Sequence, residues 1–269
     1  MTDPKTNKLL QVTGLTKSFG GIKALQDMSL DIKAGELVAL IGPNGAGKTT
    51  FFNCLTGMYQ ADHGQVQLKG NLLKGLKPSE ITQVGIARTF QNIRLFDQLT
   101  VIENVLVGCH ASLQSTFIDA IFRTTRHKEE EEEAKEKSYQ LLEKLNLLQH
   151  AQSKADSLPY ADQRRLEIAR ALATEPKLLL LDEPAAGMNH SETAELDQLI
   201  LQLKEEFGLG ILLIEHDMKL VMKISDRIFV MDRGAGIAVG TPSEIRANKK
   251  VIAAYLGEEI EEDAGAENA

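Results

Sequence analysis

The sequence predicts an α/β fold built around a covered parallel sheet. Three short apolar runs support this prediction, namely Glu36–Ile41, Leu178–Leu181 and Ile211–Ile214. A strand that is apolar on both faces is typical of the middle of a parallel sheet with helices on each side. Segments with helical spacing separate the runs, and strands that alternate with helices favour right-handed connections.

The other elements follow in order from local periodicity. Alternating apolar residues predict short strands, and apolar residues three or four positions apart predict helices. The further strands that we expect are Leu9–Val12, Met28–Ile32, Gln65–Leu68 and Ile228–Met231. The helices that we expect are Thr50–Leu55, Arg164–Ala173, Ser191–Phe207 and Met218–Ile224, with a helical region over residues 95–158 in which Ile102, Val105, Leu106, Tyr139, Leu142, Leu145 and Leu148 have helical spacing.

The composition is ordinary for a globular protein. Of the 269 residues, 43% are hydrophobic and 25% are charged, and no apolar run approaches the ~20 residues that span a bilayer. Met1–Lys8 is polar and lacks the apolar core of a secretory signal, so we expect a cytoplasmic chain unless another protein holds it at a membrane. The net charge of −8 argues weakly against nucleic acid as the main partner. Cys54 and Cys109 form no CxxC pair and are interpreted as reduced structural thiols.

The segment after Ile41 matches a phosphate-binding loop. Its pattern is G-x-x-x-x-G-K-[ST], between an apolar strand and a helical stretch. Glycines allow consecutive backbone N–H groups to surround a polyphosphate, and the helix start adds partial positive charge. The alternative is a glycine-rich turn that carries Lys-Thr by chance, but the flanking elements argue against it. The residues predicted to bind nucleotide here are Gly42, Pro43, Asn44, Gly45, Ala46, Gly47, Lys48, Thr49 and Thr50.

Two of these residues have predicted roles beyond the loop backbone. We expect Lys48 to reach the outer phosphates and to act in catalysis, and we expect the Thr49 hydroxyl to bind Mg²⁺. The apolar run Leu178–Leu181 ends in Asp182 and Glu183. A strand beside the loop strand would bring Asp182 toward the metal, while Glu183 would polarise the attacking water. The alternative, a buried strand with a solvated acidic end, is common, so only the combination with the loop makes this signal strong.

With these motifs in place, the sequence resembles the ABC-transporter ATPase family over almost its whole length. Phe19 stands where the family has an aromatic residue that stacks on adenine, although a core aromatic residue at a strand end is the alternative. Gln91 matches the glutamine that senses Mg²⁺ and water. His216 matches the histidine that contacts the γ-phosphate, and the alternative is a surface or capping residue beside Asp217, which could begin the next helix.

The signature segment departs from the family pattern. The family has Leu-Ser-Gly-Gly-Gln at a helix start, and this start donates hydrogen bonds to the γ-phosphate that the partner subunit holds. Pro159 offers neither a hydroxyl nor an N–H, so one or two of these ligands are lost. Asn189 replaces the usual Asp of the segment in which two subunits touch. The residues aligned with the signature are Leu158, Pro159, Tyr160, Ala161 and Asp162.

Three stretches resemble one subgroup, the ATPase subunits of high-affinity branched-chain amino-acid importers. They are Ala87–Phe96, Leu99–Val105 and Ala253–Glu258. The subgroup also has an extended helical lobe, which would correspond to Cys109–His150. The resemblance implies uptake of Leu, Ile or Val, although no residue here would touch the amino acid.

The resemblance further implies a P-loop NTPase fold with a mixed RecA-like core sheet, an antiparallel β subdomain and an inserted helical lobe. Residues 1–94 would form the β subdomain and the first part of the core, 95–163 the helical lobe, 164–257 the second part of the core, and 258–269 an acidic, disordered tail. ATP and Mg²⁺ are the implied cofactors. The implied partners are a second ABC ATPase subunit, two membrane permease subunits and, indirectly, a periplasmic binding protein, at the cytoplasmic face of the inner membrane.

Other classes fit less well. An ABC importer for another substrate would share every motif. A soluble ABC ATPase that acts on nucleic acid or ribosomes usually carries a coiled coil or a second cassette, whereas this chain has one loop and an acidic balance. A GTPase would need an Asn-Lys-x-Asp guanine-binding motif, which the sequence lacks.

Overall fold

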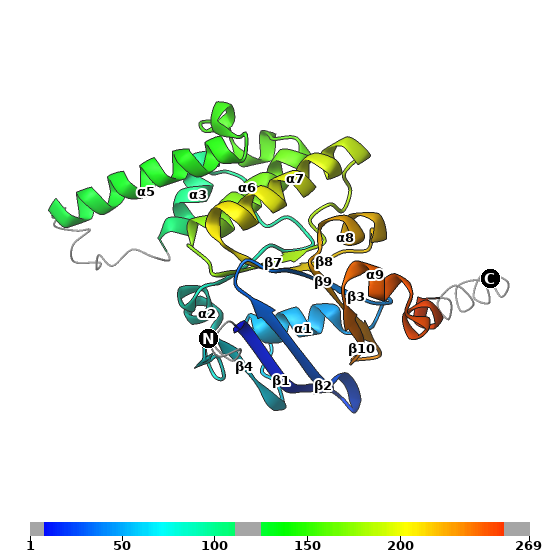
Figure 1. Cartoon of the computed structure of the whole chain (residues 1–269). Coiled ribbons are helices and arrows are strands. Elements are labelled where there is room, and N and C mark those ends of the chain that lie inside the picture. Colours follow the sequence, from blue (N-terminus) through cyan, green and yellow to red (C-terminus); the bar gives the residue numbers. More distant parts are fainter. Residues whose placement is uncertain (1–7, 111–124, 256–269) are drawn as a thin grey trace, which may run out of the picture. The chain divides into compact units, whose positions relative to one another are not determined.

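The computed structural model describes residues 8–110 and 125–255 (Figure 1). Packing divides the chain into two compact units. The first contains the residues up to Ile81 and those from Leu201 onward, and the second contains Thr82–Ile200. The predicted acidic tail, 258–269, and part of the Ala253–Glu258 stretch lie outside the described residues. The subdivision into β subdomain, core and helical lobe stays a prediction.

In the first unit, two long strands form most of an antiparallel sheet. The strands β1 (Lys8–Phe19) and β2 (Ile22–Lys33) pair along their length and meet at the Gly20–Gly21 turn. Both glycines have positive φ, as a two-residue hairpin requires. The sheet order is β2-β1-β4-β5, with β4 at His63–Leu68 and β5 at Asn71–Leu72. The predicted strands in this region are therefore confirmed, and β1 and β2 are much longer than expected.

The parallel strands of the first unit centre on the strand before the phosphate-binding loop. This strand, β3 (Leu37–Ile41), is fully buried and pairs in parallel with β8 (Gly210–Ile214) on one edge and with β9 (Arg227–Asp232) on the other. β10 (Ala235–Gly240) is antiparallel to β9, so the sheet is mixed. The expectation that the strand ending at Asp182 lies beside β3 is wrong, because a strand has only two edges and both are taken.

The first unit also contains α1 (Lys48–Leu55), which follows the phosphate-binding loop. Three further helical segments pack against these strands through a common apolar core, namely α8 (Met218–Ile224), α9 (Pro242–Arg246) and a helical segment at 249–255. α8 begins at Asp217, whose carboxylate accepts the N–H groups of Lys219 and Leu220, as a good N-cap does. The core residues are Ala39, Ile41, Val221, Ile228, Val230, Ile245 and Val251.

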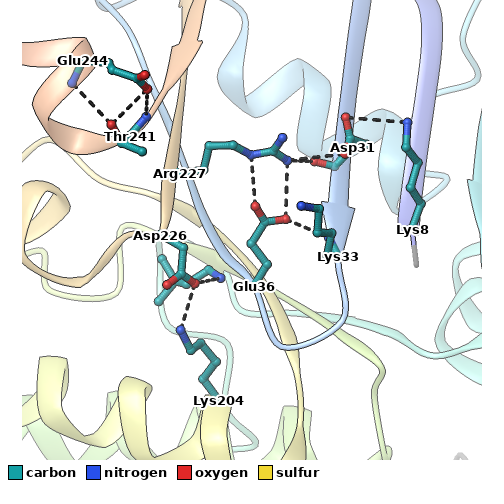
Figure 2. A network of polar contacts seen from close by, with 10 residues as sticks. Lys8, Asp31, Lys33, Glu36, Lys204, Asp226, Arg227, Thr241 and Glu244 are labelled. Atoms are coloured by element: carbon teal, nitrogen blue, oxygen red, sulfur yellow. Dashed lines mark hydrogen bonds and ion pairs between the residues drawn. The ribbon is translucent and has the colours of Figure 1, made fainter. Parts of the chain in front are cut away.

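A polar network ties β2, β3 and β9 together (Figure 2). Arg227 at the start of β9 forms an ion pair with Glu36, whose Oε1 lies 3.0 Å from Nε, and a second one with Asp31 of β2. Asp226 accepts the N–H of Leu37 at 2.7 Å and the Lys204 ammonium at 2.8 Å. The start of β3 is therefore fixed by charged groups from elements far apart in the sequence.

The second unit combines a parallel strand pair with helices. The strands β6 (Ile86–Arg88) and β7 (Leu178–Asp182) pair directly. In Figure 1, α3 (Val101–Cys109), α5 (Thr125–Lys144) and α6 (Tyr160–Ala173) lie against one another. The helices α2 (Pro78–Val84) and α7 (His190–Phe207) contain the two points at which the chain passes from one unit to the other. Gly108 permits the close approach of α3 to α6, since a Cβ there would meet the Arg170 carbonyl oxygen at 2.4 Å.

The helix that we expected to continue through Leu148 ends earlier. α5 stops at Lys144, and Asn146 takes a left-handed φ of 58°. Asparagine tolerates this conformation better than most residues and commonly ends helices with it. Leu148 then begins a short 3₁₀ turn, Leu148–His150, and a second one follows at Ala155–Ser157.

Both cysteines are buried and free, which confirms their interpretation as reduced structural thiols. Burial raises the pKa of the Cys54 thiol to about 11, because a thiolate is poorly solvated in apolar surroundings. Among the described helices, none combines the length and the apolar composition that crossing a bilayer would require.

Candidate functional site

The phosphate-binding loop runs from the end of β3 to the start of α1 and needs glycine at two points. At Gly42 a Cβ atom would come within 2.1 Å of the Met231 carbonyl oxygen. Gly47 has a φ of 99°, and a Cβ there would lie 2.5 Å from the Ala24 carbonyl oxygen. No other residue fits either position without a backbone shift. The glycines of the motif therefore shape the loop itself.

Lys48 is buried within this loop. Its Nζ donates hydrogen bonds to the carbonyl oxygens of Gly42 at 2.6 Å and Pro43 at 2.9 Å. The Ala46 carbonyl accepts the N–H of Gly234, which follows β9. Thr49 is exposed in the first turn of α1. The loop is thus held by its own lysine and by the β9–β10 turn, next to the positive end of a helix.

A cavity of about 540 Å³ opens beside the first half of the loop. One wall is the loop backbone, and the opposite wall is formed by the β9–β10 hairpin and the 249–255 helix. The cavity is lined by Pro43, Asn44, Gly45, Ala46, Asp232, Arg233, Ile237, Lys250, Ala253 and Ala254.

Phe19 ends β1 with an exposed ring. The ring is 42% exposed, which excludes the alternative of a core aromatic residue. It packs edge-on against Tyr59, with 5.1 Å between the ring centroids, and the Lys17 ammonium lies 5.3 Å from its centroid. Lys17 is held in turn by Asp62 at 2.9 Å. Sequence reasoning missed Tyr59, because a lone tyrosine after a helix carries no signal of its own.

In the second unit, Asp182 ends β7 as a buried carboxylate. Its Oδ2 accepts the Arg88 guanidinium at 2.7 Å, and both side chains are almost fully buried. The Thr89 hydroxyl lies 3.4 Å from the Asp182 amide nitrogen. Arg88 was not singled out from the sequence, and only its place three residues before Gln91 could have drawn attention to it.

Glu183 follows with a backbone φ of 49°, in the left-handed region. This turn makes its carboxylate leave β7 in a different direction from that of Asp182. The Gln91 Nε2 donates to Glu183 Oε2 at 2.9 Å. The structure therefore brings together Gln91 and Glu183, two residues that were predicted separately.

His216 belongs to the first unit and follows β8 with an exposed side chain. Its backbone N–H is accepted by the Glu215 carboxylate at 3.1 Å. Asp217, not His216, caps α8. The capping alternative for His216 is therefore wrong, whereas its exposed side chain, at the carboxyl end of β8, fits the alternative of a surface residue.

The signature segment begins α6 without a side-chain cap. Pro159 occupies the N-cap position and makes no side-chain hydrogen bond there, as its chemistry dictates. Tyr160 is 45% exposed, and its hydroxyl accepts the Arg164 guanidinium at 3.0 Å. Asp162 pairs with Arg165 at 3.4 Å. The predicted helix start at Arg164 is thus one turn too late.

Asn189 caps the start of α7. Its side-chain oxygen accepts the N–H groups of Ser191 at 2.9 Å and Glu192 at 3.0 Å, and the Glu192 carboxylate accepts the Asn189 N–H. This reciprocal arrangement is typical of a capping box. Asparagine performs it as well as aspartate, so the loss of charge at this position leaves the helix start intact.

A family model described as "ABC transporter" matches residues 25–186. The chain belongs to this family. A second model, described as "Branched-chain amino acid ATP-binding cassette transporter", matches residues 237–261, which include part of the wall of the cavity beside the loop. As an ABC ATPase, the protein binds ATP, and the predicted α/β cassette with a mixed and an antiparallel sheet is confirmed.

Curated relatives of this ABC ATPase are similar along nearly their entire length. The LivG protein of Salmonella typhimurium, named a high-affinity branched-chain amino acid transport ATP-binding protein, is 51% identical over 93% of this chain and 98% of its own. The BraF protein of Pseudomonas aeruginosa, with the same descriptive name, is 50% identical over the same shares.

Solved ABC cassettes have the same fold. A nucleotide-free ATP-binding cassette of an ABC transporter superposes with a TM-score of 0.80 at 33% identity, covering 92% of this chain and 98% of that one. A cassette in its ADP conformation gives a TM-score of 0.81 at 32% identity, covering 93% and 99%.

Proposed function

We propose that this ABC ATPase is the ATP-hydrolysing subunit of an importer for branched-chain amino acids (Leu, Ile or Val). The observation that carries the ATPase part is the glycine-shaped loop whose carbonyls hold the buried Lys48. The choice of substrate is supported by the relatives, which are 50–51% identical over nearly their whole length and are named for branched-chain amino acid transport.

The nucleotide-binding roles follow from the chemistry of the first unit. The loop Gly42–Thr50 supplies N–H groups for the phosphates, and Lys48 exchanges loop carbonyls for phosphate oxygens. The exposed Phe19 ring offers a face on which adenine can stack, with Tyr59 supporting it from the side. His216 holds the γ-phosphate.

Thr49, Asp182 and Gln91 are the residues that would hold Mg²⁺. Proteins bind Mg²⁺ through one or two carboxylates together with phosphate and water oxygens, and Asp182 is the carboxylate among these three residues. When bound, the ion offsets negative charge on the phosphates. Asp182 also forms an ion pair with Arg88. This ion pair therefore competes with the metal for the oxygens of the Asp182 carboxylate.

For hydrolysis we assign Glu183 to the attacking water. Its carboxylate accepts a hydrogen bond from the water. This aims the water oxygen at the γ-phosphorus, in line with the phosphorus–oxygen bond that breaks. Gln91 fixes the direction of that carboxylate through its 2.9 Å hydrogen bond. Lys48 stabilises the charge that develops on the phosphate. Lys48 and His216 lie in the first unit, and Gln91 and Glu183 lie in the second.

Transport requires partners. A second ABC ATPase would present its signature segment to the γ-phosphate, and the segment Leu158–Asp162 would serve the partner's nucleotide in return. Two permease subunits would hold the pair at the cytoplasmic face of the inner membrane, with a periplasmic binding protein on the far side. A cavity of about 430 Å³ in the second unit, lined by Arg94, Phe96 and Arg170 among others, is where we expect a permease segment to dock.

The test is amino-acid-stimulated ATP hydrolysis by the full-length chain, copurified with its permeases and its second ATPase. Leucine and its binding protein should raise hydrolysis severalfold, and Lys48→Ala should abolish it. Lys23→Ala, which removes an exposed lysine from β2, is the matched control and should hydrolyse normally. Full hydrolysis by Lys48→Ala would contradict the ATPase proposal, and stimulation only by an unrelated solute would contradict the substrate proposal.

A further inference from the structure

Arg164 is a fully buried charge on the helix that follows the signature segment. It lies in the second turn of α6 and is 2% exposed. Burying a guanidinium is costly unless its donors find acceptors, and an apolar side chain of similar size would fill the same space at lower cost. The position of its acceptors therefore indicates what the charge does.

Two of its acceptors are the backbone carbonyl oxygens of two successive residues, Phe90 and Gln91. Arg164 Nη1 donates to the Phe90 carbonyl oxygen at 2.6 Å, and Nη2 donates to the Gln91 carbonyl oxygen. Glu167, one turn further along α6, accepts the Phe90 N–H at 3.1 Å and pairs with Arg164 at 3.2 Å. Burial raises the pKa of the Glu167 carboxyl, and Phe90 and Arg164 oppose this. Three hydrogen bonds thus fix the backbone from which the Gln91 side chain projects.

The same backbone leads to the reacting end of β7. The Gln91 side chain donates to Glu183, the carboxylate to which the proposed function assigns the attacking water. Only one residue therefore separates the Arg164 guanidinium from Glu183. Arg165, the next residue on α6, pairs instead with Asp162 and with Glu195. Of these two arginines, Arg164 is therefore the one that bonds the backbone at Gln91.

The Arg164 guanidinium also contacts Tyr160, the first residue of α6. Its hydroxyl accepts Arg164 Nη2 at 3.0 Å, and the guanidinium carbon lies 5.5 Å from the ring centroid. The ring faces Gly187, where a Cβ would lie 3.3 Å from the Tyr160 ring. The family's signature pattern has glycine where Tyr160 stands, so the departure from the pattern supplies a polar contact to Arg164.

The geometry points to Arg164 as a positioning residue that makes the placement of Gln91, and hence of Glu183, depend on the start of α6. The inference rests on the proposed function. A displacement of Tyr160 when the signature segment meets the partner's nucleotide moves the guanidinium, and the backbone at Phe90 and Gln91 moves with it. The two nucleotides of the pair are then coupled through this chain by hydrogen bonds from a single side chain.

The test is a double-mutant cycle on the copurified transporter, with Arg164→Met, Gln91→Ala and both together. Arg164→Met should lower kcat for ATP about 10- to 100-fold and leave KM within about twofold, which separates positioning from nucleotide binding. If Arg164 acts through Gln91, the double variant should match Gln91→Ala alone within about twofold. The inference would be overturned if the double variant lost kcat by the product of the two single losses. It would also be overturned if Arg164→Met changed KM without changing kcat.

Lys137→Met is the matched control. Lys137 also donates to α6, but at its far end, where Nζ bonds the Ala173 carbonyl oxygen at 3.3 Å. This variant should keep the wild-type kcat. A loss equal to that of Arg164→Met would mean that any loosening of α6 has the same effect, and the inference would fail.

Tyr160→Phe covers the case in which Arg164→Met does not fold, because it removes a single hydroxyl. It should lower kcat severalfold and speed amide hydrogen exchange at residues 90–92, while exchange in α1 stays unchanged. Wild-type kcat together with unchanged exchange at 90–92 would contradict the inference. Hydrolysis that survives Lys48→Ala refutes the proposed function, whereas additive Arg164 and Gln91 effects with an inactive Lys48→Ala refute this inference alone.

Discussion

Gln91 holds Glu183 by a 2.9 Å hydrogen bond between the side-chain amide and the carboxylate, at a residue whose φ is 49°. A left-handed backbone at a residue with a Cβ costs of order 1 kcal/mol or more and tends to be kept where function needs it. Here the strained turn separates the directions of two successive carboxylates. Asp182 pairs with Arg88, and Glu183 pairs with Gln91.

Replacing Glu183 with Gln should nearly abolish hydrolysis without loss of ATP binding. The amide keeps the shape of the side chain but cannot accept a proton, and loss of a general base typically costs 10²–10⁴ in rate. The measurement is phosphate release together with equilibrium binding of ATP, for which we expect a long-lived closed dimer. Glu132→Gln, on the exposed face of α5, is the control. Wild-type turnover of Glu183→Gln would remove Glu183 from its role.

Phe19→Ala should weaken ATP binding about tenfold, since stacking of a base on an aromatic ring contributes about 1–3 kcal/mol. Tyr59→Ala should weaken it less, because Tyr59 contacts the Phe19 ring at its edge. Equilibrium binding of ATP and GTP measures both effects, and the two nucleotides should lose affinity equally. Ile22→Ala removes a 75% exposed side chain at the other end of the same turn and should change nothing. Unchanged affinity in Phe19→Ala would place adenine elsewhere.

Gly42→Ala should destabilise the fold by at least about 2 kcal/mol, because its Cβ would overlap the Met231 carbonyl oxygen at 2.1 Å. Gly75→Ala is the matched control: Gly75 has a φ of 83° but nothing within 4 Å of the added atom. That variant should lose only the ~1 kcal/mol of the left-handed backbone. Denaturant unfolding measures both. Equal losses would show that the loop shifts freely away from β9.

Cys54 should resist alkylation in the folded protein. With a pKa of about 11, roughly one thiol in a thousand is ionised at pH 8, and the thiolate is the reactive form. The rate with iodoacetamide should rise about tenfold per pH unit until the pH approaches 11. Mass spectrometry of the Cys54 peptide measures it, with the urea-unfolded chain as the reference. A native rate at pH 8 equal to the unfolded rate would contradict the assigned burial.

The sequence predicted most central elements because their signals are strong. Buried strands such as Leu178–Leu181 and a capped helix such as Met218–Ile224 leave clear patterns, and the structure places them within a residue or so of the expected bounds. β6 has only three residues, and β10 is built from small residues with partly exposed positions. Such short or weakly apolar strands are defined by their neighbours in the sheet and not by their own periodicity.

The site could be predicted by residue type but not by arrangement. Gln91 and Glu183 were each identified, yet nothing in the spacing of 92 positions shows that they share a hydrogen bond. The neighbour of β3 was predicted wrongly, because chain order does not set strand order in a parallel sheet. Arg88 and Arg164 were not identified as site residues, since a buried arginine looks like a surface arginine until its acceptors are known.

The lysine that closes the phosphate-binding loop already holds the carbonyl oxygens of Gly42 and Pro43. The conformational entropy of this turn is therefore lost when the chain folds and not when the nucleotide binds. A polyphosphate thus binds to a loop that is already ordered. The contacts of the phosphates with the loop N–H groups then need little further ordering, although Lys48 must give up its two carbonyl contacts to reach a phosphate oxygen. A change that loosened the turn would therefore weaken nucleotide binding even if every phosphate ligand remained in the sequence.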